Sequence, residues 1–328
     1  MLECIVILAG AFLLDMALGD PVYRLHPVRL LGHAITGLER FLFRTGQNGF
    51  IGGAILFAGA ISCGIACVMA AKLLWRAFPA SGILAFPFLV YSCIGFMDLF
   101  RHALPVEGAL NDGDTPKARS RLSRMVGRDV SVLDREGITR ATVESVAENF
   151  VDGFLSILFW FGAGALAAFA AGLPPAPVAA GCAILFRTVN TLDAMVGYRS
   201  ERYRHFGTVS ARVDDILNFM PARLSIPVIA AAAALCRTGA RRCIHTGLRD
   251  RLVHASPNAG HPESCVAGAL GIRLGGPVRY PQRMLDKPWM GDDINPITPS
   301  HIHQACRLMF CAGWIAFLPV VFIFSRLL

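Results

Sequence analysis

Acidic side chains recur at helical spacing in the middle of the chain. Glu144, Glu148 and Asp152 follow one another by four residues. A helix of 3.6 residues per turn places all three within about 80° on one face. Neighbouring carboxylates repel one another, so Mg²⁺ or arginine side chains must offset their charge. Because Asp152 enters an apolar stretch, we expect a functional acidic face here rather than a solvated helix end.

A second polar group lies near the end of an apolar stretch. Arg187, Asn190 and Asp193 are spaced by three residues, so they share about a third of a helix surface. For Arg187, an ion pair inside a helix bundle and a functional role fit equally well. For Asn190 and Asp193 the pattern favours function.

A third group combines Asp214, Asp215 and Asn218. The first and last of these are one helical turn apart. Carboxylate and amide oxygens suit Mg²⁺, which commonly uses one or two carboxylates together with substrate phosphate. The alternative is N-terminal charge on a short helix. It is weaker because the aspartates stand directly before an apolar run.

The segment after the first apolar run carries Asp20, His26 and Arg29. Gly19-Asp20-Pro21 is a turn signal, and Pro27 stiffens the backbone further. The simplest interpretation is that a helix leaves the membrane here and that these polar residues anchor its end at the membrane surface. His26 and Arg29 could instead contact an anionic substrate.

A second turn-forming stretch runs from Ser256 to Glu263 and includes Asn258. Ser-Pro-Asn-Ala-Gly favours a tight turn, and its backbone N–H groups could cradle phosphate. The Lys-Ser/Thr end of a Walker A loop is absent. The small residues after the turn, including Gly268 and Gly271, permit close helix packing.

The elements that position these groups are predicted to be membrane helices. Of the 328 residues, 54% are hydrophobic and 16% are charged, and the mean hydropathy is +0.52. Soluble domains carry about 25% charged residues. This composition argues against a water-soluble enzyme, a disordered chain and a nucleic-acid-binding domain, despite the net charge of +8. The ten cysteines form no Cys-x-x-Cys pair, which disfavours a disulfide scaffold.

We therefore predict an all-α, polytopic membrane bundle in a single domain, residues 1–328. A spanning helix needs about 20 mostly apolar residues. Six segments qualify: 2–19, 50–71, 80–100, 150–172, 176–197 and 305–327. The shorter run 224–236 contains Pro227 and fits a re-entrant or half-membrane helix better.

The distribution of Lys and Arg predicts the orientation. The connections 20–49, 101–149, 198–223 and 237–304 hold four, eight, five and nine of these residues, whereas 173–175 holds none. The positive-inside bias makes the four basic connections cytoplasmic if 224–236 does not cross. We expect a multi-pass protein of the bacterial inner membrane with its active face in the cytoplasm.

Long motifs in this chain resemble the CobD/CbiB family, the membrane-bound adenosylcobinamide-phosphate synthases of cobalamin biosynthesis. The resemblance covers nearly the whole chain. It rests on LLDMALGDPVYRLHPVRLLG, ATVESVAENFVDGFLSILFW, NTLDAMVGYRSERYRHFGTVSARVDDILNFMPARL and SPNAGHPESCVAGALGIRLGG, which occur in this order.

The resemblance implies a ligase that joins aminopropanol, or its O-phosphate, to a propionate of adenosylcobyric acid. The product is adenosylcobinamide or its phosphate, and the corrinoid is a substrate rather than a cofactor. ATP is expected to drive amide formation, with Mg²⁺ as its metal. The bilayer is an expected partner and nucleic acid is not. Other enzymes of the pathway, or a second copy of the chain, stay open as partners.

The roles of single residues come from spacing and chemistry, not from the resemblance. The carboxylates expected to hold metal or remove a proton are Glu144, Glu148, Asp152, Asp193 and Asp214, with Glu148, Asp152 and Asp214 as the metal ligands. The expected substrate-binding residues are Asp20, His26, Arg29, Asn149, Asn190, Arg199, Arg212, Asp215, Asn218, Arg223, Ser256, Asn258 and Glu263. We expect these groups to converge at the inner leaflet.

Two other functions fit the same residues. A Mg²⁺-dependent intramembrane transferase acting on a lipid or alcohol diphosphate would have similar acidic helices. Such enzymes usually carry two tight Asp repeats, and only 214–218 approaches one. A corrinoid or anion carrier ranks last, because carriers often show repeated halves and the sequence shows none.

Overall fold

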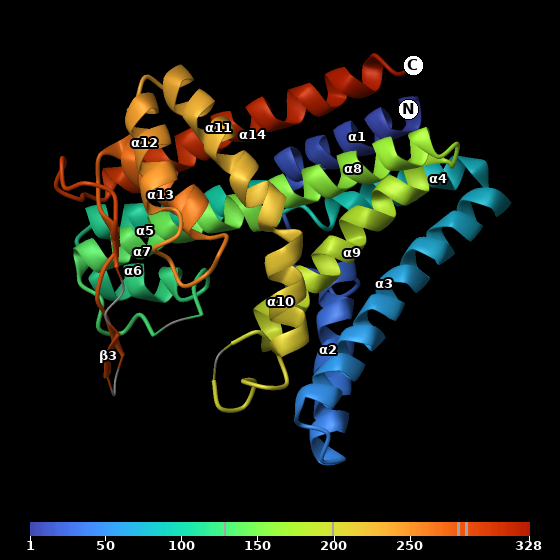
Figure 1. Cartoon of the computed structure of the whole chain (residues 1–328), viewed down its shortest axis with the longest axis horizontal. Helices are drawn as coiled ribbons and strands as arrows, with labels where there is room; N and C mark the ends of the chain where they lie inside the picture. The colour runs from blue at the N-terminus through green and yellow to red at the C-terminus, as the bar shows by residue number, and fades with distance from the viewer. Residues whose placement is uncertain (128, 199, 281–282, 286–287) are drawn as a thin grey trace. The chain divides into compact units, whose positions relative to one another are not determined.

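The computed structural model describes residues 1–127, 129–198, 200–280, 283–285 and 288–328. Nearly all of their regular structure is helical (Figure 1). The prediction of an all-α, polytopic membrane bundle is confirmed. The chain forms two compact units, which we call unit 1 and unit 2. Unit 1 comprises Met1–Gly95, Ser156–Leu217 and Pro319–Leu328, and unit 2 comprises Phe96–Leu155 and Asn218–Leu318.

Unit 1 is built from long apolar helices and one amphipathic helix, α2. Its helices are α1 (Leu2–Leu18), α2 (Pro27–Arg44), α3 (Phe50–Ala77), α4 (Pro79–Tyr91), α8 (Ser156–Ala170), α9 (Pro175–Val196) and α10 (Thr208–Leu217). Within it, α9 packs against both α8 and α3. Helix α9 therefore forms the centre of this unit.

Unit 2 contains shorter helices, two small β-ribbons and most of the last helix. Its elements are α5 (Phe96–Asn111), α6 (Thr115–Leu122), α7 (Arg135–Phe150), the π-helical turn η1 (Val151–Leu155), α11 (Phe219–Leu235), α12 (Ala240–Asp250), α13 (Gly260–Leu270), β1 (Leu274–Gly275), β2 (Val278–Tyr280), β3 (Arg283–Leu285), β4 (Trp289–Met290) and α14 (Ser300–Ser325). The ribbons are antiparallel pairs, β1 with β4 and β2 with β3.

Five stretches of the described residues are long and apolar enough to cross a membrane. They are Phe50–Ala77, Leu84–Asn111, Arg135–Ala170, Pro175–Val196 and Ser300–Ser325. A sixth candidate arises if α10 and α11, which follow one another in the chain, are counted together as one broken span or re-entrant loop. The re-entrant reading of 224–236 stays a prediction, although α11 begins five residues earlier than expected.

Two predicted spans differ from the structure. Helix α1 has 17 residues, so the predicted span 2–19 falls just short of the length that the other spans reach. The predicted span 80–100 largely coincides with the stretch Leu84–Asn111, but a turn lies within it. Helix α4 ends at Tyr91, and the amides of Cys93 and Ile94 close this turn onto Val90 and Tyr91. A hydropathy average along the sequence does not detect this turn, because the residues that form it are mostly apolar.

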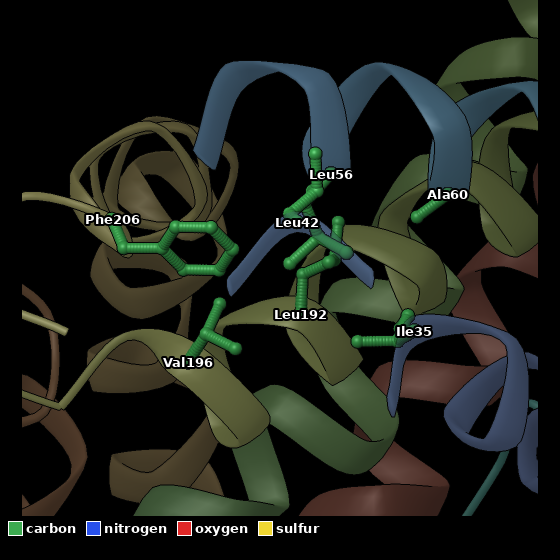
Figure 2. Packing of buried hydrophobic residues seen from close by; sticks show 7 residues of the cluster. All are labelled: Ile35, Leu42, Leu56, Ala60, Leu192, Val196 and Phe206. Carbon is green, nitrogen blue, oxygen red and sulfur yellow. The ribbon is translucent and has the colours of Figure 1, made fainter. Parts of the chain in front are cut away.

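A buried apolar cluster fixes α2, α3 and α9 in unit 1 (Figure 2). Its members are Ile35, Leu42, Leu56, Ala60, Leu192, Val196 and Phe206. Phe206 comes from the connection before α10, and its ring lies edge-on to Phe43 at 4.9 Å. A Cβ at Gly53 would lie 1.8 Å from the Phe206 carbonyl oxygen. Only glycine therefore allows α3 to approach this connection so closely.

A buried carboxylate fastens the same connection to α2. Glu39 is 7% exposed. Its Oε1 accepts hydrogen bonds from Arg202 Nη2 and from the Tyr203 hydroxyl, both at 2.9 Å. Buried charges require such partners. Polar and apolar contacts thus hold one loop against α2.

The core of unit 2 is aromatic where α5, η1 and α14 meet. The Phe96 ring lies 4.5 Å from Phe154 and 5.1 Å from Phe100, and it stacks on Phe310 at 6.1 Å. Helix α13 is buried along its entire length. A Cβ at Gly268 would lie 2.5 Å from the Arg242 carbonyl oxygen of α12. The predicted close packing through small residues after the Ser256 turn is therefore confirmed.

Replacement of Phe206 by alanine should lower the free energy of unfolding by about 3–5 kcal/mol, because it leaves a cavity among packed side chains. Unfolding in mixed micelles, followed by circular dichroism, measures this loss. Phe41→Ala is the matched control, since Phe41 on α2 is 60% exposed. A loss for Phe206→Ala no larger than the control's would contradict the assignment of this cluster as a core.

Candidate functional site

The first predicted polar stretch forms a close pair in unit 1. His26 is 1% exposed, and its Nε2 lies 2.7 Å from Asp20 Oδ1. The turn is held by the Tyr91 hydroxyl, which donates to the Gly19 carbonyl oxygen at 2.6 Å. Arg29, one turn into α2, is exposed. The structure therefore brings Asp20 and His26 together in a fixed turn and leaves Arg29 at the surface.

The second and third stretches meet between α9 and α10. Asn190 Oδ1 accepts a hydrogen bond from Arg187 Nη1 at 3.3 Å, and Asn190 Nδ2 donates to Asp214 Oδ1 at 3.4 Å. Asp214 is 7% exposed. Arg187, Asn190 and Asp214 thus form a row of hydrogen-bonded side chains across two helices, in which Asn190 contacts both of the others. We call this row the polar file.

The remaining acids of unit 1 flank this file. Asp193 lies against Gly197, where a Cβ would come within 1.9 Å of Asp193 Oδ1. Asp215 is close enough to Asp193 for their charges to interact. Arg212 on α10 is exposed, and Arg199 lies outside the described residues. Asn190, Asp193, Asp214 and Asp215 therefore lie close together in unit 1.

The acidic helix of unit 2 departs from the regular spacing. Glu144 Oε1 accepts a hydrogen bond from the Gly275 amide at 2.7 Å, which fastens α7 to strand β1. Glu148 is exposed. Asp152 lies in the π-helical turn η1 rather than in a continuous α-helix. The assumption of 3.6 residues per turn holds from Glu144 to Glu148 within α7 but is wrong for Asp152, because a π turn contains more residues than an α-helical turn.

Asn149, on the same helix, is bonded locally. Its Nδ2 donates to the Ser145 carbonyl oxygen at 2.8 Å and lies 3.1 Å from the Ser145 hydroxyl. These contacts are typical of a helix-stabilising amide. They give the predicted ligand-orienting role no support of their own.

The Ser256 turn leads into the buried helix α13. Ser256 Oγ accepts from the amides of Asn258 and Ala259 at 3.3 and 3.2 Å. Asn258 and Glu263 are 7% and 3% exposed. The predicted turn is present. Two of the backbone N–H groups that the sequence predicts to bind phosphate donate instead to the hydroxyl of Ser256.

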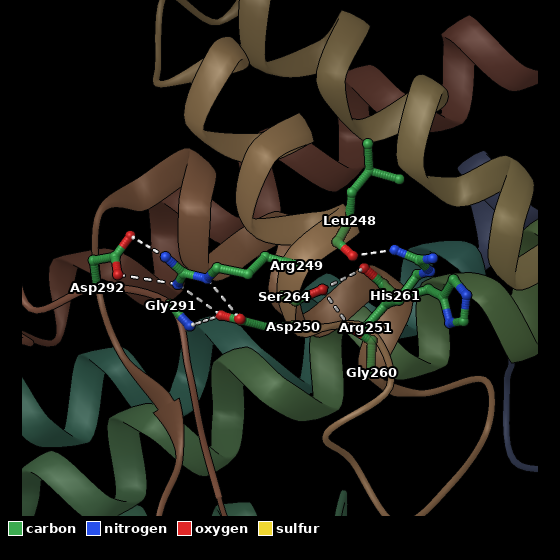
Figure 3. Close-up of polar contacts among 9 residues, drawn as sticks. All are labelled: Leu248, Arg249, Asp250, Arg251, Gly260, His261, Ser264, Gly291 and Asp292. Atoms are coloured by element: carbon green, nitrogen blue, oxygen red, sulfur yellow. Dashed lines mark hydrogen bonds and ion pairs between the residues drawn. The ribbon is translucent and has the colours of Figure 1, made fainter.

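Two arginines lie near the start of α13. Arg223 on α11 donates to the Phe219 carbonyl oxygen at 2.7 Å, and its guanidinium stacks on the Phe219 ring at 3.3 Å. Arg251, at the end of α12, donates to the Leu248 carbonyl oxygen (Figure 3). The two positive charges interact with each other. Each guanidinium keeps further N–H donors that an anion could accept.

His261 is a candidate site residue that the sequence reasoning missed. Its side chain is fully buried, and both ring nitrogens are without hydrogen-bond partners among the described residues. Burial, with the charges of Arg223 and Arg251, lowers the pKa of His261 to about 4. The imidazole is therefore neutral at physiological pH. The sequence feature that could have indicated His261 is a histidine in the first turn of a helix that consists mostly of small apolar residues.

An ion-pair network stabilises the end of α12 next to Arg251 (Figure 3). Arg249 donates to both carboxylate oxygens of Asp250, at 2.7 and 2.8 Å, and contacts Asp292 at 3.0 Å. The Gly291 amide donates to Asp250 at 2.8 Å. The guanidinium of Arg249, followed by this amide, lowers the pKa of Asp250. These bonds connect the helix to the loop after β4.

The predicted metal ligands are divided between the units. Glu148 and Asp152 belong to unit 2, and Asp214 belongs to unit 1. Among the described residues, no group of three or more His, Cys, Asp or Glu side chains is arranged to hold a metal ion. Asn218, the last residue of the Asp214 motif, opens α11 in unit 2 and is 2% exposed. A single metal pocket shared by all these groups stays a prediction.

Comparison with known proteins now decides the family. The family described as "CobD/Cbib protein" matches residues 8–309. The chain belongs to the CobD/CbiB family. No solved structure shows a significant match to it.

Relatives within the CobD/CbiB family are similar over almost their whole length. The cobalamin biosynthesis protein CbiB of Salmonella choleraesuis is 40% identical over 311 residues, with 93% of each chain covered. The cobalamin biosynthesis protein CobD of Klebsiella pneumoniae gives the same identity and coverage. That of Citrobacter koseri is 41% identical over 315 residues, again with 93% of each chain.

The low pKa of His261 predicts a pH-dependent stability. Between about pH 6.5 and pH 4 the unfolded chain binds a proton at this imidazole that the folded protein does not bind. The free energy of unfolding should therefore fall as the pH is lowered through this window. In His261→Asn that contribution is absent, so its stability should fall less steeply.

Chemical unfolding of both proteins at several pH values measures the effect. His245→Asn is the control, because His245 on α12 is exposed, and it should follow the wild-type profile. Parallel profiles for wild type and His261→Asn would show that the folded protein does protonate this imidazole readily.

Proposed function

We propose that this chain catalyses the amide-forming step of cobalamin biosynthesis that attaches aminopropanol, or its O-phosphate, to a propionate of adenosylcobyric acid. The observation that supports this most directly is family membership over nearly the full chain, with relatives named as cobalamin biosynthesis proteins. The membrane-spanning helices fit an enzyme embedded in the bilayer. The distribution of Lys and Arg supports a cytoplasmic active face at the bacterial inner membrane.

The chemistry requires activation of the carboxylate. A propionate is a poor acyl donor because its leaving group would be oxide. In the proposed reaction ATP transfers its terminal phosphoryl group to a propionate oxygen, and ADP leaves. The amine nitrogen then attacks the acyl carbon, the bond from that carbon to the phosphate oxygen breaks, and inorganic phosphate leaves. The proton that the nitrogen carries passes to a base.

The polar file of unit 1 supplies a carboxylate for this proton. Asp214 is buried beside Asn190, whose amide fixes the position of one carboxylate oxygen. Asp193 and Asp215 add negative charge close by. Such a group would attract an ammonium substrate and accept its proton during attack. Mg²⁺ bound by one or two of these acids would neutralise phosphate oxygens.

The positive group of unit 2 suits phosphate. Arg223 and Arg251 each donate one hydrogen bond to a backbone carbonyl oxygen. Their other N–H groups can donate to a phosphate. The neutral His261 beside them can donate one hydrogen bond and accept another. We assign this group to a phosphate of ATP or of the aminopropanol substrate. Neither the transferase nor the carrier alternative gains support from relatives named for cobalamin biosynthesis.

Asp214→Ala should reduce product formation by about 10²-fold or more, the range for loss of a group that moves a proton. Glu148→Ala should also reduce it, because Glu148 is a predicted metal ligand. Membranes carrying each variant are incubated with adenosylcobyric acid, aminopropanol phosphate and Mg-ATP, and the amide is quantified by mass spectrometry. Asp112→Ala, at an exposed residue after α5, controls for expression and insertion. Near-normal turnover by both variants would overturn the assignment of these acids.

Omission of ATP tests the energy source separately. Without ATP, the wild-type protein should form no amide above background, because the acyl group is not activated. Without Mg²⁺, in the presence of a chelator, turnover should fall at least about tenfold, since the metal offsets phosphate charge. Full activity without nucleotide would contradict ATP-driven ligation while leaving the family assignment intact.

A further inference from the structure

Unit 1 contains a cavity of about 400 Å³. Arg187, the end of the polar file that is farthest from Asp214, is part of its wall. Its walls come from the first turns of α2, the middle of α3, the end of α4 and the Arg187 turn of α9. Most of the wall is apolar, including Leu30, Leu31, Cys63 and Cys67. Its volume lies within the roughly 300–1,000 Å³ of small-molecule sites.

Arg187 gives this apolar cavity a positive end. Among the described residues that line the cavity it is the one charged side chain. Its Nη1 donates to Asn190, whereas its Nε is buried and has no hydrogen-bond partner among the described residues. A buried donor without an acceptor is costly. The cavity therefore offers a charged donor to a ligand that brings an acceptor.

The start of α2 adds to the positive potential. Pro27 and Val28, the first two residues of this 18-residue helix, also line the cavity. The N-terminal end of a helix carries a partial positive charge from its aligned peptide dipoles. Arg187 and this helix end together favour an anion over a neutral or cationic group.

The cavity is reachable from the lipid side of the helices. Leu30 is 46% exposed, and both Ala34 and Cys63 are exposed. All three line the cavity. Cys63 lies on α3, which is long and apolar enough to span a membrane, so we expect this opening of the cavity to face hydrocarbon. An occupant that enters here must have an apolar chain.

We propose that this cavity binds an anionic phospholipid of the surrounding bilayer. One acyl chain lies along the apolar wall of α2 and α3, and the phosphate accepts hydrogen bonds from the Arg187 guanidinium. Part of one acyl chain fills the cavity, and the rest of the lipid stays in the bilayer. The proposal goes beyond the ligase function and does not depend on it.

Native mass spectrometry of the full-length protein in detergent tests this directly. Dioleoylphosphatidylglycerol and dioleoylphosphatidylcholine are titrated separately, so that only the headgroup charge differs. We expect the wild type to retain one phosphatidylglycerol at a concentration about tenfold lower than phosphatidylcholine requires. Both lipids carry a phosphate that Arg187 can bind, so the preference arises from the choline cation of phosphatidylcholine, which cancels the charge of its phosphate and is repelled by the guanidinium.

Three variants test whether Arg187 causes the preference for phosphatidylglycerol. Arg187→Gln should abolish the tenfold preference, and Arg187→Lys should retain part of it, because the charge remains. Arg76→Gln is the matched control, since Arg76 is an exposed arginine at the end of α3 that does not line the cavity. A preference that survives in Arg187→Gln would overturn the proposal.

Alkylation of Cys67 by N-ethylmaleimide, followed on its peptide by mass spectrometry, reports occupancy at the cavity itself. Phosphatidylglycerol should slow this reaction several-fold in the wild type and not in Arg187→Gln. Ala34→Phe places a ring in the cavity, so it should slow the reaction without lipid and prevent lipid retention. Equal protection by inorganic phosphate or by phosphatidylcholine would show a soluble-anion site or a nonspecific apolar crevice, and either result rejects an anionic lipid site.

Discussion

Polar groups on apolar helices need partners within the protein, because hydrocarbon offers no hydrogen bonds. This constraint is visible throughout unit 1. Asn190 donates to Asp214 between α9 and α10, Tyr91 donates to the end of α1, and Trp160 donates to the Leu217 carbonyl oxygen at 3.1 Å. Each contact joins two different elements. The bonds that satisfy these groups therefore also fix the relative positions of the helices that carry the acids.

The two units meet this constraint in different ways. In unit 1, pairs of side chains bridge long helices, and the cluster around Phe206 fills the space between them. In unit 2, close packing leaves helix α13 buried along its length. Such packing excludes water around His261, and the nearby arginines further disfavour its protonation. One unit thus collects negative charge at Asp193, Asp214 and Asp215, whereas the other collects positive charge beside a neutral imidazole.

Several expectations from the sequence are borne out because they depend on local periodicity. Residues three or four apart on a helix face the same side, so Arg187 and Asn190 were expected to be neighbours, and they are. The same logic failed at Asp152, because a π turn needs five-residue hydrogen bonding that no hydropathy pattern reveals. The span predicted at 80–100 largely coincides with Leu84–Asn111, although apolar residues form a turn within it.

The sequence by itself determined the class of structure, the family and the identity of the polar segments, because composition and local spacing carry that information. Only the tertiary structure decided which of those segments meet. It joined Asn190 to Asp214, fastened Glu144 to a strand amide, and buried His261 near two arginines that lie 38 and 10 residues away in the sequence. Such contacts depend on how distant helices pack, and packing is set by the shapes of all the side chains together rather than by any one stretch of the chain.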